Sequence, residues 1–331
     1  MATQNTIRAF WVPEAGRGEI REGVQDRPGP GEVQIRTLYS GISRGTESLV
    51  FQGRVPESQY EVMTCPFQEG SFPGPVKYGY MNVGVVEDAG EEARELMDQR
   101  VFCLYPHQDR YVVPATAVQL VPEEVPSARA ILAANLETAV NGVWDAAPGV
   151  GDRVVVVGGG VVGLMAAWLM RDLPAVELTL VDPDPTRAAV AEALKVPWAP
   201  AVPTRVEADR VLHASGSPAG LQDALAAAGT EASIIELSWY GDQAVPLGLG
   251  EAFHSRRLTI RSSQVGRIPP ERAPRWTHRR RLGLALRLLE APELDALISG
   301  ESAFLELPEV MKELATGSAG TLCHRIRYPT S

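Results

Sequence analysis

The stretch Val154-Val155-Val156-Val157-Gly158-Gly159-Gly160-Val161-Val162-Gly163 decides the fold of this chain. The four valines predict a buried strand, and the apolar segment from Val161 to Met170 is compatible with a helix, so the glycines form the turn between them. A second predicted strand (Val176–Val181) and helix (Thr186–Leu194) follow. This alternation predicts a doubly wound α/β fold, in which helices cover both faces of a parallel sheet.

The glycines of this turn have the G-x-G-x-x-G spacing typical of dinucleotide-binding proteins. Gly158 would permit the tight turn, and Gly160 would let the backbone approach a pyrophosphate. Gly163 would allow close packing of helix and strand, while Val162 lies in the first helical turn, whose N–H groups would face the anion. The alternative is a glycine-rich turn that binds no ligand.

Asp182 ends the next predicted strand, 19 residues beyond Gly163, close to the spacing of about 20 in dinucleotide-binding folds. Its carboxylate would accept hydrogen bonds from both hydroxyls of an adenosine ribose and repel a 2′-phosphate. We therefore predict NAD(H) as the cofactor. The nearby Arg187 leaves room for some use of NADP(H).

The rest of the chain divides into a β-rich first third and an alternating part beyond about residue 133. Strands are predicted at 32–39, 83–87, 100–104 and 110–113 in the first third, and at 210–214, 233–237 and 258–261 after the glycine turn. Helices are predicted at 221–228, 279–289 and 307–314, and a strand at 321–328. The length of 331 residues suits about two domains.

Composition excludes several classes of protein. With 45% hydrophobic and 22% charged residues, disorder, collagen and coiled coil are excluded as the dominant state. The longest uncharged stretch, 154–170, is shorter than the about 20 apolar residues of a membrane span, and no secretion signal is evident, so we expect a cytoplasmic protein. Cys65, Cys103 and Cys323 are odd in number and far apart, which predicts free, buried thiols.

The net charge of −10 opposes binding to nucleic acid or to an anionic membrane. Residues 254–281 are an exception, with nine arginines against the single acid Glu271, a local charge of +8. These arginines could attract an anionic small-molecule substrate. Alternatively, they form a solvated, salt-bridged surface, which is the simpler interpretation.

Several short motifs occur in the order and spacing of one large enzyme family. They are Gly31–Val33, Ser40–Glu47, Gly79–Glu87, Val150–Val154 leading into the glycine turn, and Ala214–Ser217. On these motifs the chain resembles the medium-chain dehydrogenase/reductase superfamily over nearly its whole length. The resemblance implies a GroES-like β-rich catalytic domain (1–133 and 265–331), a Rossmann domain (134–264), a substrate cleft between them, and a homodimer.

The positions that bind zinc in the superfamily's alcohol dehydrogenases are occupied by other residues here. They match Ser43, Tyr80, and either Ala134 or Asn135, none of which is a usual zinc ligand, and the four-cysteine structural zinc lobe is absent. We therefore predict a member without zinc or another metal. The motif Ser40–Glu47 is most similar to the bacteriochlorophyllide dehydrogenases, which hints at the substrate.

The resemblance also suggests which residues replace the metal. Tyr80 would face the nicotinamide and donate to a developing alkoxide, or it would merely fill the space of the lost ligand. His107 has a side chain suited to acid–base chemistry near neutrality, although a lone histidine is often structural. Ser43 would bond the substrate oxygen or a water, and Glu47 would act as a base or in a salt bridge.

The same resemblance assigns the remaining cofactor contacts. Arg44 matches a position that reaches the pyrophosphate, where an arginine fork fits two phosphate oxygens. The other residues assigned to cofactor binding are Thr138 and four residues that follow predicted strands of the Rossmann domain, Ser215, Leu237, Ser238 and Ser262.

The leading hypothesis is an NAD(H)-dependent, zinc-independent oxidoreductase that interconverts a secondary alcohol and a ketone, with Tyr80 or His107 handling the proton. Reduction of a conjugated C=C bond, as in enoyl and quinone reductases, is a variant of it. A second hypothesis is a catalytically silent dinucleotide-binding protein that senses redox state or acts as a scaffold. A third keeps zinc through unusual ligands such as Glu47, Cys103 or His107.

Overall fold

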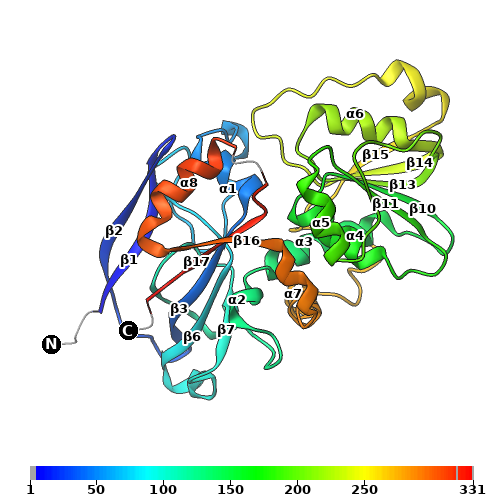
Figure 1. Cartoon of the computed structure of the whole chain (residues 1–331). Helices are drawn as coiled ribbons and strands as arrows, with labels where there is room; N and C mark the ends of the chain where they lie inside the picture. The colour runs from blue at the N-terminus through cyan, green and yellow to red at the C-terminus, as the bar shows by residue number, and fades with distance from the viewer. Residues whose placement is uncertain (1–4, 318–319, 330–331) are drawn as a thin grey trace. The chain divides into compact units, whose positions relative to one another are not determined.

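The computed structural model describes residues 5–317 and 320–329, and the chain folds into two compact units. The first unit holds the described residues of Met1–Ala134, Leu282–Pro292 and Ile298–Ser331, and the second holds Asn135–Arg281 and Glu293–Leu297. Figure 1 labels the elements of both units. The first unit is thus built from both ends of the chain.

The second unit contains a six-stranded parallel sheet. Its strands are β10 (Arg153–Val157), β11 (Glu177–Val181), β12 (Trp198–Ala199), β13 (Ala208–His213), β14 (Ala228–Glu236) and β15 (Thr259–Ser262). The order across the sheet is β12-β11-β10-β13-β14-β15. Numbered along the unit this is 3-2-1-4-5-6, the order of doubly wound dinucleotide-binding sheets, with the topological switch between β10 and β13.

Helices pack on this sheet (Figure 1). They are α4 (Val161–Met170) on β10 and β11, α5 (Thr186–Ala193) on β12, and α6 (Pro218–Ala227) on β13 and β14. Helix α3 (Ala133–Ala146) and the short helical segments η4 (Leu249–Phe253) and η5 (Pro292–Leu297) complete this part of the chain. Helix α7 (His278–Leu288) begins in the second unit, and its residues from Leu282 on group with the first. All four valines of β10 are buried, which explains why the strand is an uninterrupted apolar run.

The first unit is mostly β-structure. One sheet has the order β2-β1-β5-β4, and a seven-stranded sheet has the order β16-β17-β3-β6-β7-β9 with β8 paired to β3. The strands are β1 (Asn5–Glu14), β2 (Arg17–Gln25), β3 (Glu32–Ile42), β4 (Glu69–Gly70), β5 (Val76–Lys77), β6 (Asn82–Ala89), β7 (Arg100–Cys103), β8 (Arg110–Pro114), β9 (Val118–Leu120), β16 (Ile298–Ala303) and β17 (Cys323–Arg327).

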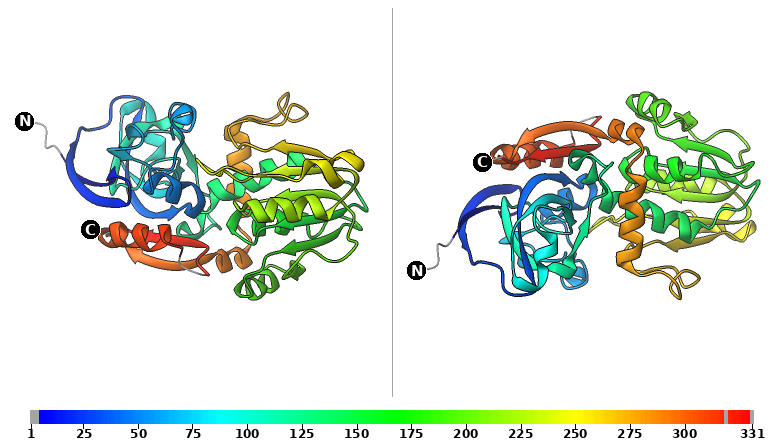
Figure 2. Two further views of the ribbon diagram at one scale, coloured as in Figure 1. Left: turned by 90° about the horizontal axis from the view of Figure 1, so that it is seen from above. Right: turned by 90° about the horizontal axis from the view of Figure 1, so that it is seen from below.

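Segments from the two chain ends lie side by side in the first unit. Strand β17 pairs antiparallel with β3, and α8 (Leu307–Ala315) packs on β2 and on α1 (Arg44–Phe51). Figure 2 shows this in both of its views, with the blue N-terminal and the red C-terminal segments adjacent. Helix α2 (Ser127–Ala130) and the 3-10 helices η1 (Glu57–Gln59), η2 (Glu91–Leu96), η3 (Ala115–Ala117) and η6 (Phe304–Glu306) connect these elements.

The structure confirms the predicted α/β fold and shows some differences from the sequence analysis. The hairpin of β1 and β2 and helix α1 are additional elements. Residues 265–281 group with the second unit rather than the first, because the buried guanidinium of Arg281 bonds Glu137 (3.0 Å), Asn141 and the carbonyl of Val265. The second domain boundary therefore lies later than the resemblance implies.

Two further expectations concern single residue types and helix length. Cys65, Cys103 and Cys323 are free and buried, as their number and spacing predict. In the part of the chain that the structure describes, no helix is both long enough and apolar enough to span a bilayer.

Candidate functional site

One edge of the parallel sheet collects most of the residues assigned to cofactor binding. The last pairs in register are Val181 with Val157, Val157 with His213, His213 with Glu236, and Glu236 with Ser262. The side chains that follow these strand ends therefore meet along a single edge: Gly158, Asp182, Ser215, Leu237, Ser238 and Ser262. The carboxyl edge of an open α/β sheet, at the switch point, is the usual ligand site of such folds.

The glycines of the turn after β10 have three different environments. Gly158 has φ +111°, and a Cβ there would lie 2.5 Å from the backbone nitrogen of Ser215. A Cβ on Gly163 would lie 1.9 Å from the carbonyl oxygen of Gly158, so neither position accepts a side chain. At Gly160 a Cβ would meet nothing within 4 Å. The turn is therefore closed on the protein side and open at Gly160.

Gly160 is also the N-cap of α4, and no side chain caps that helix end. The N–H groups of its first turn, including that of Val162, thus face the open side of the turn. A helix N-terminus that begins at an open glycine suits a pyrophosphate, because the N–H groups and the helix dipole both favour an anion.

Asp182 bonds directly to the glycine turn. Its Oδ2 accepts from the N–H of Gly159 (2.6 Å), and its Oδ1 accepts from the N–H of Asp184 (2.9 Å). Each carboxylate oxygen can accept a second hydrogen bond, so both remain suited to ribose hydroxyls. Arg187 is buried and ion-paired with Asp184 at 3.3 Å, which engages its guanidinium with a carboxylate.

The other assigned residues are placed less uniformly. Leu237 packs so closely on helix α3 that a Cβ on Gly142 would lie 2.4 Å from its Cδ2, and Thr138 is half-buried on the same helix. Ser262 is exposed at the end of β15. Arg44 lies in the first unit, where its Nη1 donates to the carbonyl of Thr321 (2.7 Å), so its contact with a pyrophosphate stays a prediction.

In the first unit the structure brings the four predicted catalytic residues together. Glu47, in the first turn of α1, accepts from the N–H of Ser43 through Oε1 (2.8 Å). Its Oε2 lies 2.8 Å from Nε2 of His107, and Nδ1 of His107 lies 2.7 Å from Oγ of Ser40. Both Glu47 and His107 are buried. The roles assigned to them from the sequence stay predictions.

Tyr80 is the half-buried member of this group. The hydroxyls of Ser43 and Thr46 lie near its phenol, and the ring of Tyr78 stands edge-on at a centroid distance of 6.1 Å. Burial, reinforced by the negative charge of Glu47, raises the pKa of Tyr80 well above its ordinary value of 10.0. The phenol is therefore held in its protonated form and can donate a hydrogen bond at any physiological pH.

The donor groups at this position do not suit zinc. Ser43 and Tyr80 carry neutral hydroxyl groups, whereas zinc takes thiolate, imidazole or carboxylate ligands. Both ring nitrogens of His107 already face Glu47 and Ser40. Within residues 5–317 and 320–329, no group of three or more His, Cys, Asp or Glu side chains is arranged around a common point that could hold a metal.

Four polar residues of these clusters were missed by the sequence analysis. They are Ser40 and Tyr328 in the first unit, whose hydroxyl oxygens lie 3.0 Å apart, and His213 and Glu236 in the second. The signal for the second pair is present in the sequence, since each is a polar residue that ends a parallel strand directly after two apolar residues. Nothing local marks Ser40 and Tyr328, which are 288 residues apart.

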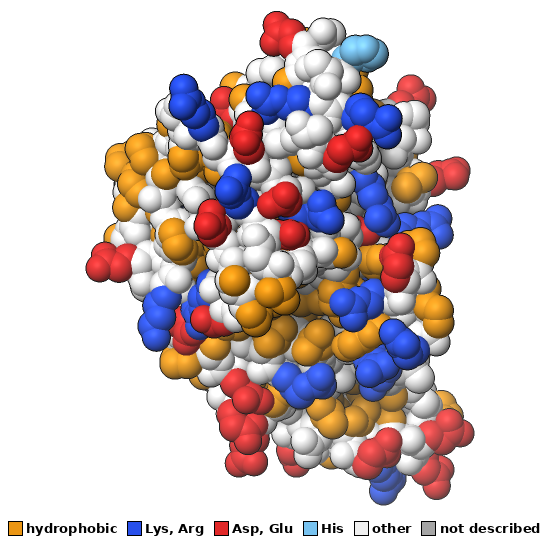
Figure 3. Space-filling view, turned by 90° about the vertical axis from the view of Figure 1, so that its right-hand side faces the viewer, with side chains coloured by type: hydrophobic (Ala, Val, Ile, Leu, Met, Phe, Trp, Pro, Cys, Tyr) orange, Lys and Arg blue, Asp and Glu red, His pale blue; other side chains and the backbone are white. Residues whose placement is uncertain are grey.

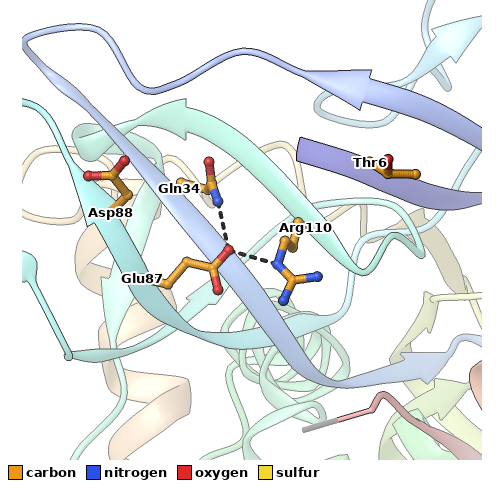
Figure 4. A pocket seen from close by; sticks show the side chains of 5 residues that line it. All are labelled: Thr6, Gln34, Glu87, Asp88 and Arg110. Atoms are coloured by element: carbon orange, nitrogen blue, oxygen red, sulfur yellow. Dashed lines mark hydrogen bonds and ion pairs between the residues drawn. The ribbon is translucent and has the colours of Figure 1, made fainter. Parts of the chain in front are cut away.

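A polar hollow of the first unit contains none of the predicted site residues. Thr6, Gln34, Glu87, Asp88 and Arg110 line it (Figure 4). Gln34 donates to Glu87 (2.6 Å), and so does Arg110 (2.9 Å). This carboxylate is already satisfied by the protein, which favours a structural role.

The arginine-rich stretch forms ion pairs within the second unit. Arg257 pairs with Glu231 (2.6 Å), and Arg261 pairs with Asp145 (2.8 Å). On the face drawn in Figure 3, lysine and arginine side chains are interspersed with acidic ones. Both observations suit a salt-bridged surface, and attraction of an anionic substrate stays a prediction.

Comparisons with known proteins agree with this architecture. No family model matches the chain. The D-guloside 3-dehydrogenase of Escherichia coli K12 is 25% identical over 274 residues, which cover 75% of this chain and 78% of that protein.

Two solved structures superpose on nearly the whole chain. A zinc-binding dehydrogenase from Sinorhizobium meliloti 1021, bound to NADP, has a TM-score of 0.77 at 19% identity and covers 98% of this chain and 100% of its own. A structure described as a short chain alcohol dehydrogenase from Escherichia coli CFT073, in complex with NADH, has a TM-score of 0.75 at 16% identity and covers 97% and 99%. At these identities the likeness establishes the fold.

Proposed function

The chain has the GroES-like and Rossmann fold of the medium-chain dehydrogenase/reductase superfamily, and we propose that it is an NAD(H)-dependent oxidoreductase that interconverts a secondary alcohol and a ketone without zinc. The observation that carries this proposal is the bond from the N–H of Gly159 to Asp182, beside the open helix end at Gly160. This hydrogen bond links Asp182, which would bind the ribose, to the glycine turn at the helix end that would bind the pyrophosphate.

The residues of the second unit fit the coenzyme. The first turn of α4 would hold the pyrophosphate, and Asp182 would accept from the hydroxyls of the adenosine ribose. A 2′-phosphate would meet the carboxylate of Asp182, while the guanidinium of Arg187 is paired with Asp184. These contacts favour NAD(H) over NADP(H). The nicotinamide supplies the hydride acceptor or donor when the coenzyme is bound.

Tyr80 would polarise the substrate oxygen through a hydrogen bond, in place of the Lewis acid that zinc supplies elsewhere in the superfamily. Its phenol stays protonated, so it would donate to the carbonyl oxygen of a ketone and then give its proton to the alkoxide that forms as hydride arrives. The hydroxyls of Ser43 and Thr46 orient the phenol. Because the raised pKa makes the phenolate scarce at neutral pH, reduction of a ketone is favoured near pH 7, and oxidation of an alcohol would gain from alkaline conditions.

His107 and Glu47 would position Tyr80 and its neighbours. The His107 side chain is only 1% exposed, between Glu47 and Ser40, so it is not placed to contact a substrate. This geometry argues against the direct acid–base role that the sequence suggests for His107. Glu47 instead secures the N-terminus of α1 through the N–H of Ser43, and His107 secures Glu47.

A fluorescence titration with NADH and, separately, NADPH tests the coenzyme assignment. We expect micromolar binding of NADH and at least tenfold weaker binding of NADPH, because the second phosphate would meet a carboxylate. The substitution Asp182→Asn should weaken NADH binding and reduce the preference. Asp223→Asn, which changes an exposed carboxylate on α6, is the matched control. Failure to bind either coenzyme would contradict the proposal.

A ketone screen on the NADH-bound protein tests the reaction. With any ketone that is turned over, Tyr80→Phe should lower kcat at least about 10-fold, because the donor to the developing alkoxide is lost. Tyr39→Phe, a half-buried tyrosine of β3, should leave kcat unchanged. Coenzyme binding without turnover of any substrate would instead favour the silent dinucleotide-binding protein.

A further inference from the structure

His213 and Glu236 form a hydrogen-bonded pair at the edge of the sheet proposed to bind the coenzyme. They end the neighbouring strands β13 and β14 and stand opposite each other in the register. Nδ1 of His213 lies 2.9 Å and 2.8 Å from the two carboxylate oxygens of Glu236. His213 has no exposed surface, whereas the Glu236 side chain is 12% exposed and adjoins an exposed loop.

The other nitrogen of His213 controls the hydroxyl of Ser215. Nε2 lies 2.6 Å from Oγ of Ser215, and that oxygen also accepts from the N–H of Ser217 (3.1 Å). A carboxylate only accepts hydrogen bonds, so Nδ1 carries the hydrogen, and Nε2 of the neutral ring is an acceptor. The hydroxyl hydrogen of Ser215 is then committed to His213. The Oγ atom of Ser215 therefore offers a ligand a lone pair, so it can act toward that ligand as a hydrogen-bond acceptor.

Glu236 ties the same loop to the one that follows β14. Its Oε1 accepts from the N–H of Ser238 (2.7 Å), and Oγ of Ser238 accepts from the N–H of Gly216 (3.0 Å). The network also contacts the glycine turn, because Gly158 packs so closely against the backbone of Ser215 that no Cβ would fit there. The pair of His213 and Glu236 therefore holds in place two loops that border the coenzyme turn.

The order serine, histidine, glutamate also resembles a nucleophile and its base. A nucleophilic serine needs free backbone donors to stabilise an oxyanion. Here the N–H of Gly216 already bonds Ser238, and the N–H of Ser217 already bonds Ser215 itself. The geometry therefore disfavours ester hydrolysis and favours the binding of a ligand.

We propose that His213 and Glu236 are positioning residues for the coenzyme, which make the Ser215 hydroxyl a hydrogen-bond acceptor for a hydroxyl or amide N–H group of the dinucleotide. Phosphate oxygens, which only accept, would be turned away from Ser215 and toward the N-terminus of α4. The inference rests on the proposed function, since it assumes that NAD(H) occupies this edge.

NADH titrations of two His213 variants test the proposal. His213→Leu removes the acceptor, and we expect the Kd for NADH to rise roughly tenfold, the effect of losing about one hydrogen bond. His213→Gln should restore most of the affinity, because its carbonyl can accept from Ser215 while its NH2 group donates to Glu236. His324→Leu is the matched control: Nε2 of that histidine lies 3.0 Å from Oγ of Ser302 in the first unit, and its loss should leave the Kd unchanged.

A double-mutant cycle separates this role from a purely structural one. If His213 acts through Ser215, His213→Leu should raise the Kd for NADH by less than about twofold when Ser215 is already replaced by alanine. A full tenfold effect in that background, or no effect in the parent protein, would overturn the inference while leaving the proposed function intact. Absence of NADH binding by the unmodified protein would overturn both.

Discussion

Each unit of the molecule contains a hydrogen-bonded chain of glutamate, histidine and serine side chains. We call the chain of the first unit closed, because its serine is buried, and that of the second unit open, because its serine is exposed. In the first unit, Glu47, His107 and Ser40 follow one another at 2.8 Å and 2.7 Å. Ser40 continues to the hydroxyl of Tyr328 at 3.0 Å, and all four residues are buried. Every polar atom of this chain faces another protein group, so it serves to hold its own surroundings.

The chain in the second unit has the same three residue types and a different end. Glu236 and His213 are joined at 2.8 Å, and His213 and Ser215 at 2.6 Å. Here the glutamate also binds the hydroxyl of Tyr240 (3.0 Å), and the serine is exposed at the edge of the sheet. The comparison teaches that the same hydrogen-bonded trio stabilises a fold where its serine is enclosed and can present a ligand contact where its serine is exposed.

Removing the histidine from each chain should separate the two roles most strongly. His107→Leu removes the hydrogen-bond partner of Oε2 of Glu47, and the Glu47 side chain is only 4% exposed. We therefore expect the free energy of unfolding to fall by about 3 kcal/mol or more. His213→Leu should cost about 1–2 kcal/mol, because Glu236 keeps the N–H of Ser238 and the hydroxyl of Tyr240. Urea unfolding measures both variants. Equal losses would erase the distinction between closed and open chains.

Alkaline pH should destabilise the first unit more than the second. Burial raises the pKa of Cys65, Cys103 and Cys323 from an ordinary 9.0 to about 12, and all three lie in the first unit. Each thiol stays protonated in the folded chain but ionises above pH 9 in the unfolded chain. Stability is therefore complete below pH 9 and falls between pH 9 and 12, by about 1 kcal/mol per thiol at pH 10.

The two units can be followed separately in that experiment. Five of the six tryptophans lie in the second unit, so tryptophan fluorescence reports mainly on its unfolding, whereas alkylation of the thiols reports on the first unit alone. Raising the pH from 8 to 10 should lower the urea midpoint measured by alkylation by more than it lowers the midpoint measured by fluorescence. Cys103→Ala should reduce the shift, because one of the three raised thiol pKa values is removed. Equal shifts for both probes would contradict the prediction.

Each histidine also packs against a glycine, which offers a finer comparison. Gly79 has φ +133°, and a Cβ there would lie 3.0 Å from Cδ2 of His107, so Gly79→Ala should cost about 1–3 kcal/mol and leave NADH binding unchanged. A Cβ on Gly220 would lie 2.2 Å from Oγ of Ser215. Gly220 is inside α6, where alanine is favoured over glycine by up to about 1 kcal/mol. Gly220→Ala should therefore change stability less than Gly79→Ala does, and it should weaken NADH binding more. The reverse pattern would show that the open chain is structural.

Local patterns were sufficient for five of the six strands of the parallel sheet, all but the two-residue β12. The valines of β10, the glycine spacing and Asp182 are neighbours in sequence or follow consecutive strands, so hydrophobic periodicity places them. Helix α1 was missed because Arg44–Phe51 contains glycine, serine and threonine, and its helical state depends on burying Val50 and Phe51. The hairpin of β1 and β2 was missed because much of β2 is exposed or half-buried and lacks a clear apolar alternation.

The sequence by itself determined the Rossmann unit, the type of coenzyme site and the absence of the usual zinc ligands, because each depends on residue types at short, regular spacings. Only the tertiary structure decided that His107 is enclosed between Glu47 and Ser40, and that His213 joins Glu236 to Ser215. These contacts join different strands, helices and loops, and Ser40 meets Tyr328 across 288 positions. Whether a histidine is exposed, enclosed or aimed at a serine depends on the packing of distant segments, which no local pattern of residues specifies.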